Sequence, residues 1–182
     1  MKLGTHNSLS YCKPQWYFRL FNFIGKCQDL NIYEQYEAGV RYYDIRVKFK
    51  KDKIVSGHGL LTYNINVEDV LDFLNDQATC NVRIVLETNL FSSKKDESKL
   101  LDTMEKWLNK YTAITFTGCY KKKPWTRLIE MEEIPYKDCF EFYEGKNLKF
   151  PYPRYYAKKK NKEYWKQVND KYYSIMDFIN IK

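Results

Sequence analysis

The stretch VRYYDIRV at residues 40–47 decides the fold class of this chain, because it is β-rich and alternates as a strand does. Alternate residues of a strand share a face. One face then carries Tyr42, Asp44 and Arg46, and the other carries Arg41, Tyr43, Ile45 and Val47. A carboxylate and a guanidinium therefore lie side by side, either as a plain ion pair or as part of a charged site.

The neighbouring segments indicate how this strand is connected. NIYEQYEAG at residues 31–39 reads as a helix with Asn31 as its N-cap and Gly39 just past its end. After the strand, the lysine-rich KFKKDK at 48–53 reads as a turn, and KIVSG at 53–57 reads as a short strand that delivers His58 at its C-terminal end. Too few residues separate these strands for a helical crossover.

Strands and helices alternate through the first 110 residues. Asn66 caps a helix at 67–76 whose apolar residues fall at i, i+3, i+4 and i+7. Residues 81–88 read as a strand with Glu87 near its end, and residues 92–111 read as an amphipathic helix. Further along, we expect strands at 112–120, 138–145 and 173–180 and a helix at 156–172. Polar groups at strand C-terminal ends are typical of α/β barrels.

Length and composition favour one basic domain over residues 1–182. The chain carries 31 Lys and Arg against 23 Asp and Glu, a net charge of +8, which favours anionic partners. No apolar run approaches the roughly 18 residues of a membrane span, and no secretory pattern is visible in the chain given. We therefore expect a soluble monomer, cytoplasmic or peripheral at a membrane surface. Five cysteines without a CxxC pair predict reduced thiols and no zinc site.

The chain has two histidines, and each lies in a small, polar, glycine-containing motif. His6 lies in GTHNS at 4–8 and His58 in SGHGL at 56–60. Either one alone reads as a satisfied polar residue. Together, flanking a strand that carries Asp44 and Arg46, they predict two histidines that act on one substrate.

These motifs resemble those of a known family, the X domain of phosphatidylinositol-specific phospholipase C. GTHNS resembles its first histidine motif, GVRYYDIRV its second strand, SGHG its second histidine motif and RIVLET its fourth strand, and SIMDFIN is similar to the closing strand of the bacterial enzymes. The resemblance implies an α/β fold, a small, distorted, incompletely closed TIM barrel. It also implies His6 as general base, His58 as general acid and Asp177 as the hydrogen-bond partner of the first histidine.

Arg46 resembles the arginine of the metal-free bacterial members, where the calcium-dependent members have a carboxylate. The resemblance thus implies no cofactor, and Arg46 disfavours calcium although Asn7, Asp44 and Glu87 match the positions of calcium ligands. Glu141 and Tyr143, in EFY at 141–143, resemble the acid and tyrosine that bind inositol. Asn7 and Glu87 are then expected near the substrate.

The residue types fit phosphodiester cleavage by a neighbouring hydroxyl. Histidine can serve as base or acid near neutral pH, and the arginine fork matches two phosphate oxygens. We expect a phosphodiesterase or lyase that cleaves phosphatidylinositol-type lipids on anionic membranes to diacylglycerol and inositol cyclic phosphate, with no nucleic acid partner. The alternatives are a glycerophosphodiesterase, a sphingomyelinase-D-like enzyme, or an inactive basic binding module.

Overall fold

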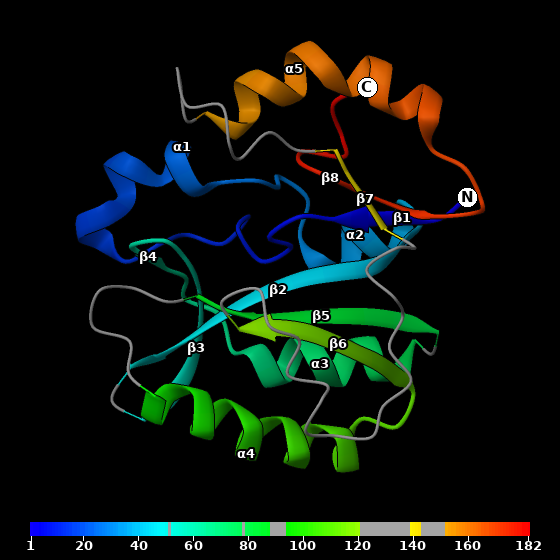
Figure 1. Cartoon of the computed structure of the whole chain (residues 1–182). Coiled ribbons are helices and arrows are strands. Elements are labelled where there is room, and N and C mark those ends of the chain that lie inside the picture. The colour runs from blue at the N-terminus through cyan, green and yellow to red at the C-terminus, as the bar shows by residue number, and fades with distance from the viewer. Residues whose placement is uncertain (51, 78, 88–93, 121–138, 143–151) are drawn as a thin grey trace.

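A computed structural model describes residues 1–50, 52–77, 79–87, 94–120, 139–142 and 152–182 (Figure 1). A curved sheet forms the centre. Helices α3 (Val67–Asp76) and α4 (Lys94–Lys110) lie along one side of it, and α5 (Pro153–Tyr164) lies on the opposite side of the molecule (Figure 1). The helices therefore surround the sheet, as in an α/β barrel.

Six strands of the sheet run parallel in the order β7–β8–β1–β2–β5–β6. Their bounds are β1 Leu3–Thr5, β2 Val40–Lys50, β5 Cys80–Leu86, β6 Ile114–Tyr120, β7 Cys139–Phe142 and β8 Tyr173–Met176. Within the described residues β6 and β7 do not pair with each other, so the sheet does not close. The predicted incompletely closed barrel is confirmed.

The second half of β2 pairs with an antiparallel strand, β3 (Lys53–His58), which continues into β4 (Leu61–Thr62). The prediction that residues 48–53 form a turn is wrong. Lys48, Phe49 and Lys50 pair with Val55, Ile54 and Lys53, so both strands extend into this segment. The hairpin brings the chain back along β2, and His58 thereby returns towards the middle of that strand.

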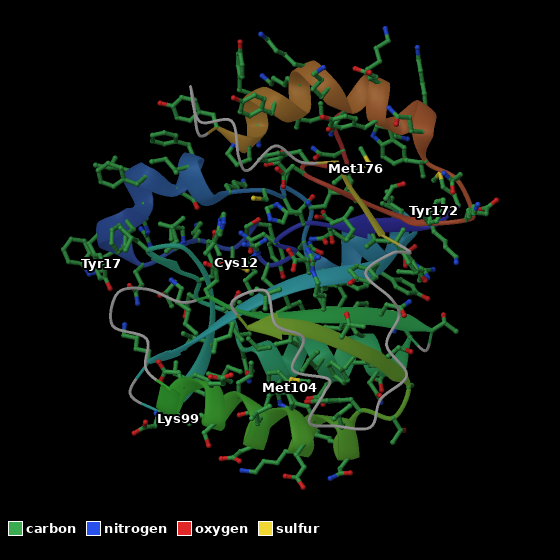
Figure 2. All side chains as sticks on the ribbon, in the orientation of Figure 1. Cys12, Tyr17, Lys99, Met104, Tyr172 and Met176 are labelled. Atoms are coloured by element: carbon green, nitrogen blue, oxygen red, sulfur yellow. The ribbon has the colours of Figure 1, made fainter. Side chains whose placement is uncertain are left out.

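Local sequence accounts for the predicted helices. Helix α2 (Ile32–Glu37) begins with a capping box in which Asn31 and Glu34 exchange hydrogen bonds. Helix α3 buries the apolar positions of its periodic pattern, Val67, Val70, Leu71 and Leu74. Met104 of α4 points from that helix towards the sheet and is fully buried (Figure 2). These contacts close the core beneath β5 and β6.

The structure differs from the predictions at three further places. Helix α5 begins at Pro153, because proline is well tolerated in the first turn of a helix. The helix ends at Tyr164, before a 3-10 turn at Trp165–Gln167. Strand β8 stops at Met176, because Phe178 takes a left-handed conformation with φ 46°. Residues 16–25, for which the sequence predicted no element, form a 3-10 helix, η1 (Trp16–Phe21), and a short helix, α1 (Asn22–Gly25). No helix within the described ranges has the length and apolar character to cross a membrane.

Candidate active site

The C-terminal ends of neighbouring parallel strands place the first residues of the site. His6 directly follows β1, Asp177 directly follows β8, and Glu87 directly follows β5. The two loops of β1 and β8 are tied together, since the backbone N–H of His6 donates to the carbonyl of Met176 at 3.0 Å. The location is the one that α/β barrels use for catalysis.

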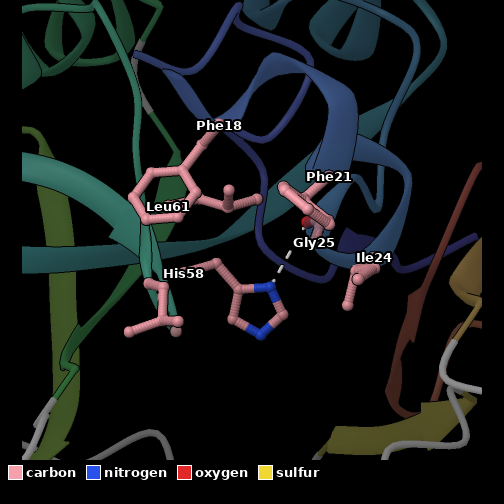
Figure 3. A pocket seen from close by; sticks show the side chains of 8 residues that line it. Phe18, Phe21, Ile24, Gly25, His58 and Leu61 are labelled. Atoms are coloured by element: carbon pink, nitrogen blue, oxygen red, sulfur yellow. Dashed lines mark hydrogen bonds between the residues drawn. The ribbon is translucent and has the colours of Figure 1, made fainter. Parts of the chain in front are cut away.

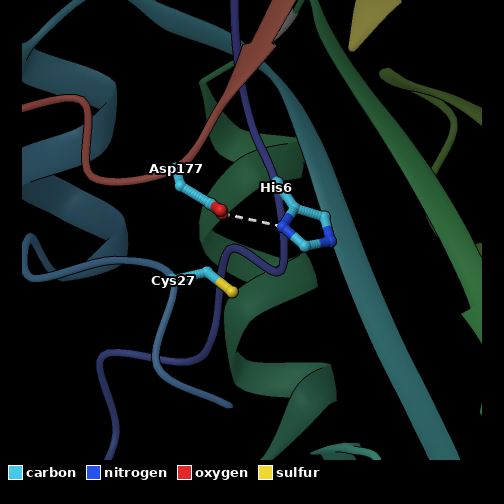
Figure 4. A group of neighbouring side chains, drawn as sticks. All are labelled: His6, Cys27 and Asp177. Carbon is cyan, nitrogen blue, oxygen red and sulfur yellow. Dashed lines mark hydrogen bonds and ion pairs between the residues drawn. The ribbon is translucent and has the colours of Figure 1, made fainter. Parts of the chain in front are cut away.

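His6 and Asp177 form a buried hydrogen-bonded pair (Figure 4). Nδ1 of His6 lies 2.7 Å from Oδ1 of Asp177. A carboxylate accepts only, so Nδ1 carries the proton and Nε2 of the neutral ring presents a lone pair. Nε2 lies 2.7 Å from Nη2 of Arg46, which donates to it. The partners on both sides therefore fix one tautomer of the imidazole.

The guanidinium of Arg46 hydrogen-bonds to three groups. Besides donating to His6, it donates through Nη1 to Oε1 of Glu87 at 2.6 Å and through Nε to Oδ2 of Asp44 at 3.2 Å. Burial alone would raise the pKa of Glu87, but the Arg46 charge beside it lowers that pKa instead. Arg46 therefore sits between two ionised carboxylates and the histidine ring.

Asp44 is the buried carboxylate at the base of the site. Its side chain is fully buried and accepts hydrogen bonds from Nε of Arg83 at 3.0 Å and from the backbone N–H of Asn7 at 3.1 Å. Burial would raise the pKa of Asp44, yet the charges of Arg83 and Arg46 outweigh it and hold the pKa well below its ordinary range. Asp44 thus stays ionised and positions Arg46.

His58 faces His6 across the site. The two ring centroids lie 6.0 Å apart and the rings are nearly perpendicular, at 87°. Nδ1 of His58 is 3.2 Å from the carbonyl oxygen of Gly25, so the opposite nitrogen, Nε2, points away from that contact (Figure 3). Burial, followed by the charge of Arg46, lowers the pKa of His58 to about 4. In the free protein this ring is therefore neutral at neutral pH.

An apolar pocket of about 450 Å³ adjoins His58 (Figure 3). It is lined by Phe18, Phe21, Ile24, Gly25, His58, Gly59, Leu60 and Leu61. Apolar side chains next to it are exposed: Trp16 at 77%, Leu20 at 84% and Leu60 at 73%. Tyr17, on the same segment, lies at the edge of the molecule (Figure 2). We refer to Trp16, Tyr17, Leu20, Phe21, Phe23, Ile24 and Leu60 as the apolar rim.

The structure brings most of the predicted site residues together. His6, His58, Asp44, Arg46, Asp177 and Glu87 are linked by the contacts given above, and Asn7 contacts the site through its backbone N–H. Glu141 lies in β7, where its backbone pairs with Ile175. Tyr143 lies outside the described residues, so its predicted role beside Glu141 stays a prediction.

The sequence did not reveal three groups that hydrogen-bond to the site residues and hold them in place. Arg83, which pairs in register with Asp44, was signalled only by an arginine inside the apolar strand NVRIVL. Gln28 donates to the carbonyls of both His6 and Met176 and so joins the two loops, at 3.1 and 2.7 Å. The Gly25 carbonyl accepts from His58 and from the hydroxyl of Tyr63. Gly25 ends helix α1 and Gln28 follows it, and no local pattern connects this segment to the histidines.

The fold and the site define an α/β protein of the TIM-barrel type, with two histidines and an arginine gathered at the ends of its strands. The chain belongs to the phosphatidylinositol-specific phospholipase C, X domain family, whose model matches residues 4–131.

A sequence relative and a solved structure, both from Listeria monocytogenes, are similar to this chain. The chain is 29% identical over 102 residues to a 1-phosphatidylinositol phosphodiesterase, a match that covers 56% of this chain and 30% of that protein. Its fold matches the structure of a phosphatidylinositol-specific phospholipase C with a TM-score of 0.68 and 16% identity, over 98% of this chain and 88% of the other. The second likeness confirms the fold; the first spans less than a third of the relative's length.

Proposed function

We propose that this protein is a metal-independent phosphodiesterase that cleaves phosphatidylinositol-type lipids to diacylglycerol and inositol cyclic phosphate. One observation carries the proposal: Arg46 lies against the lone pair of His6, within a site that His58 faces from the other side. A base, a cation and a second imidazole are then within reach of one phosphate group. The family and the named Listeria relative support the lipid class.

His6 takes the role of general base. Asp177 holds the proton on Nδ1, which leaves Nε2 free to accept the proton of the 2-hydroxyl once Arg46 has turned to the phosphate. Asp177 also stabilises the imidazolium that results. The hydroxyl oxygen then attacks phosphorus, and little entropy is lost because both groups belong to the same inositol ring.

His58 takes the role of general acid. Its Nε2 points away from the Gly25 carbonyl and would donate a proton to the departing glycerol oxygen. The lowered pKa of His58 in the free protein results first from burial and then from the charge of Arg46. A bound phosphodiester anion offsets that charge and raises the pKa, so His58 gains its proton together with the substrate.

Arg46 takes the place of a metal ion. Its guanidinium already spans Asp44 and Glu87, the carboxylates that a cation would otherwise use. The position of Arg46 also argues against the glycerophosphodiesterase and sphingomyelinase-D-like alternatives, which need a divalent ion held by carboxylates. A basic binding module would leave the paired histidines without a role.

The apolar rim suits a membrane surface. Phe21 and Ile24 of this segment are exposed and line the pocket next to His58, and Arg19 is exposed in the same segment. Aromatic and aliphatic side chains favour the interface of a bilayer, and a nearby cation favours anionic lipid. The diacylglycerol part of the substrate would leave towards this surface.

Phosphorus NMR of early reaction products tests the proposal. Purified protein is mixed with phosphatidylinositol in excess chelator, and an inositol 1,2-cyclic phosphate signal should precede that of the open monophosphate. Cleavage that yields only the open product from the earliest times, with oxygen derived from water, would show direct hydrolysis. Activity that requires added calcium would contradict the metal-independent mechanism.

A further inference from the structure

Cys27 lies beside the His6–Asp177 pair and has no part in the proposed reaction. Its side chain is fully buried, and its sulfur atom lies close to both the imidazole and the carboxylate (Figure 4). Sγ of Cys27, a ring nitrogen of His6 and a carboxylate oxygen of Asp177 all lie within 4.8 Å of one another. Thiolate, imidazole and carboxylate are the three ligand types that zinc prefers.

We propose that Cys27, His6 and Asp177 form an inhibitory zinc site within the catalytic centre. The cysteine pattern of the sequence predicted no zinc site. The three ligands are spread from position 6 to position 177, and the fold brings them together. Zinc binding to these groups stands independently of the proposed activity; only the inhibition rests on it.

The geometry needs small adjustments. Ligand atoms around tetrahedral zinc are separated by roughly 3.3–3.8 Å, given metal–ligand bonds of about 2.0–2.3 Å. The Nδ1–Oδ1 separation of 2.7 Å must therefore open slightly, while the sulfur moves closer. Both side chains keep a small exposed fraction, 7% for His6 and 9% for Asp177.

Asn7 provides a polar group at the same position. Its Nδ2 lies 3.9 Å from Sγ of Cys27, and its buried Oδ1 accepts no hydrogen bond from the described part of the chain. A half-turn of the amide would bring that oxygen to the sulfur side. Asn7 Oδ1 or water would then complete four ligands around the ion.

Binding releases one proton and moves another. Burial and the Asp177 carboxylate raise the pKa of the Cys27 thiol well above its ordinary value, so the ion must displace the thiol proton into solvent. The proton on Nδ1 of His6 leaves that nitrogen, and the neutral ring carries it on Nε2 instead. Nε2 is then a donor, so it no longer accepts from Arg46 and cannot take a proton from substrate.

Cobalt substitution tests binding without any assay of activity. Purified protein titrated with Co²⁺ should show a sulfur-to-cobalt charge-transfer band and the intense visible bands of tetrahedral cobalt, and Zn²⁺ should remove both. Cys27→Ser should abolish the charge-transfer band and raise the zinc concentration for half-maximal displacement at least about tenfold. Cys12→Ser, which removes a half-buried thiol outside the cluster, should change neither.

A second measurement uses the unaltered chain, in case Cys27→Ser does not fold. Long-range proton–nitrogen NMR should show the proton of His6 move from Nδ1 to Nε2 as zinc is added, with His58 unchanged. Micromolar zinc should also inhibit the wild-type protein and spare Cys27→Ser. A wild-type protein without the charge-transfer band, or a band that persists in Cys27→Ser, overturns the site. An active enzyme that binds zinc and is not inhibited overturns the inhibition alone.

Discussion

Arg46 donates a hydrogen bond of 2.7 Å to Nε2 of His6, the nitrogen that must take up a proton in the proposed reaction. In the free protein the base is thus held by the same cation that the substrate phosphate would attract. Phosphate binding and release of the base become one event. In the proposed mechanism, this coupling would restrict proton abstraction to molecules that carry a phosphate at Arg46.

Replacement of either histidine should remove most of the activity. His6→Ala and His58→Ala are each expected to lower turnover by roughly 100- to 10,000-fold, the range for loss of a general base or acid. His58→Ala should be partly spared on a phosphodiester with a good leaving group, which needs little protonation. Rates on both substrates, with thermal melts to confirm folding, provide the measurement. Near-normal turnover in both variants would rule out the two-histidine mechanism.

Arg46→Asp should convert the cation position into an acidic one. The variant would lose activity in chelator, because the phosphate loses its positive partner, and added calcium should restore a part of it through Asp44, Glu87 and the new carboxylate. Arg46→Lys is the matched control, since it retains charge without the fork and should keep some metal-free activity. The reaction rates of both variants are measured against calcium concentration. An equal gain in rate for Arg46→Asp and Arg46→Lys would contradict a calcium-binding role for the new carboxylate.

The titration of His58 should depend on bound anion. Its pKa of about 4 leaves roughly one molecule in a thousand protonated at neutral pH. An inositol phosphate bound at Arg46 should raise that pKa, because its negative charge offsets the guanidinium. With two histidines in the chain, proton NMR titration of wild type and His6→Ala assigns the signal. A pKa that does not move on anion binding would remove His58 as the general acid.

Asp44→Asn should destabilise the fold at neutral pH and much less in acid. Removal of the charge leaves Arg83 and Arg46 without their buried partner, which typically costs about 3–5 kcal/mol. A carboxyl whose pKa is lowered on folding stabilises above its unfolded pKa of about 3.9, and this contribution is lost as pH falls below that value. The difference in the free energy of unfolding between wild type and variant should therefore narrow below about pH 4.

Urea unfolding at several pH values measures this effect. Asp72→Asn is the control, since Asp72 is half-exposed and pairs with Lys110 at the surface. Loss of the Asp72–Lys110 ion pair should lower the free energy of unfolding by no more than about 1 kcal/mol. An Asp44→Asn protein as stable as wild type at neutral pH would show that the buried ion pairs contribute little.

The apolar rim should matter only for substrate in a bilayer. Leu20→Ser is expected to weaken binding to anionic vesicles and to slow cleavage there, because Leu20 is 84% exposed on the rim. Cleavage of a soluble short-chain substrate should be unchanged. Tyr33→Ser, which alters a 58% exposed side chain on α2, is the control and should affect neither assay. Equal losses on both substrates would assign Leu20 to folding instead.

The sequence could predict those parts of the site that local patterns encode. Alternation along residues 40–47 placed Asp44 and Arg46 on one face, and the predicted strand at 53–57 placed His58 at its end. The pairing of Arg83 with Asp44 has no local signal, since it depends on the register between two strands. The apolar rim was missed because residues 16–25 bury little of their surface, so no periodic pattern marks them.

The pairing of β1 with β8 joins segments that are far apart along the chain, and it brings together His6 and Asp177, which are 171 residues apart. Contacts between such distant positions form late, because closing a long loop costs entropy that local contacts do not. During refolding, the layer of α3, α4, β5 and β6 can therefore collapse before the His6–Asp177 pair forms. Recovery of activity would then lag behind recovery of helical signal, and a half-folded chain would leave lipid untouched.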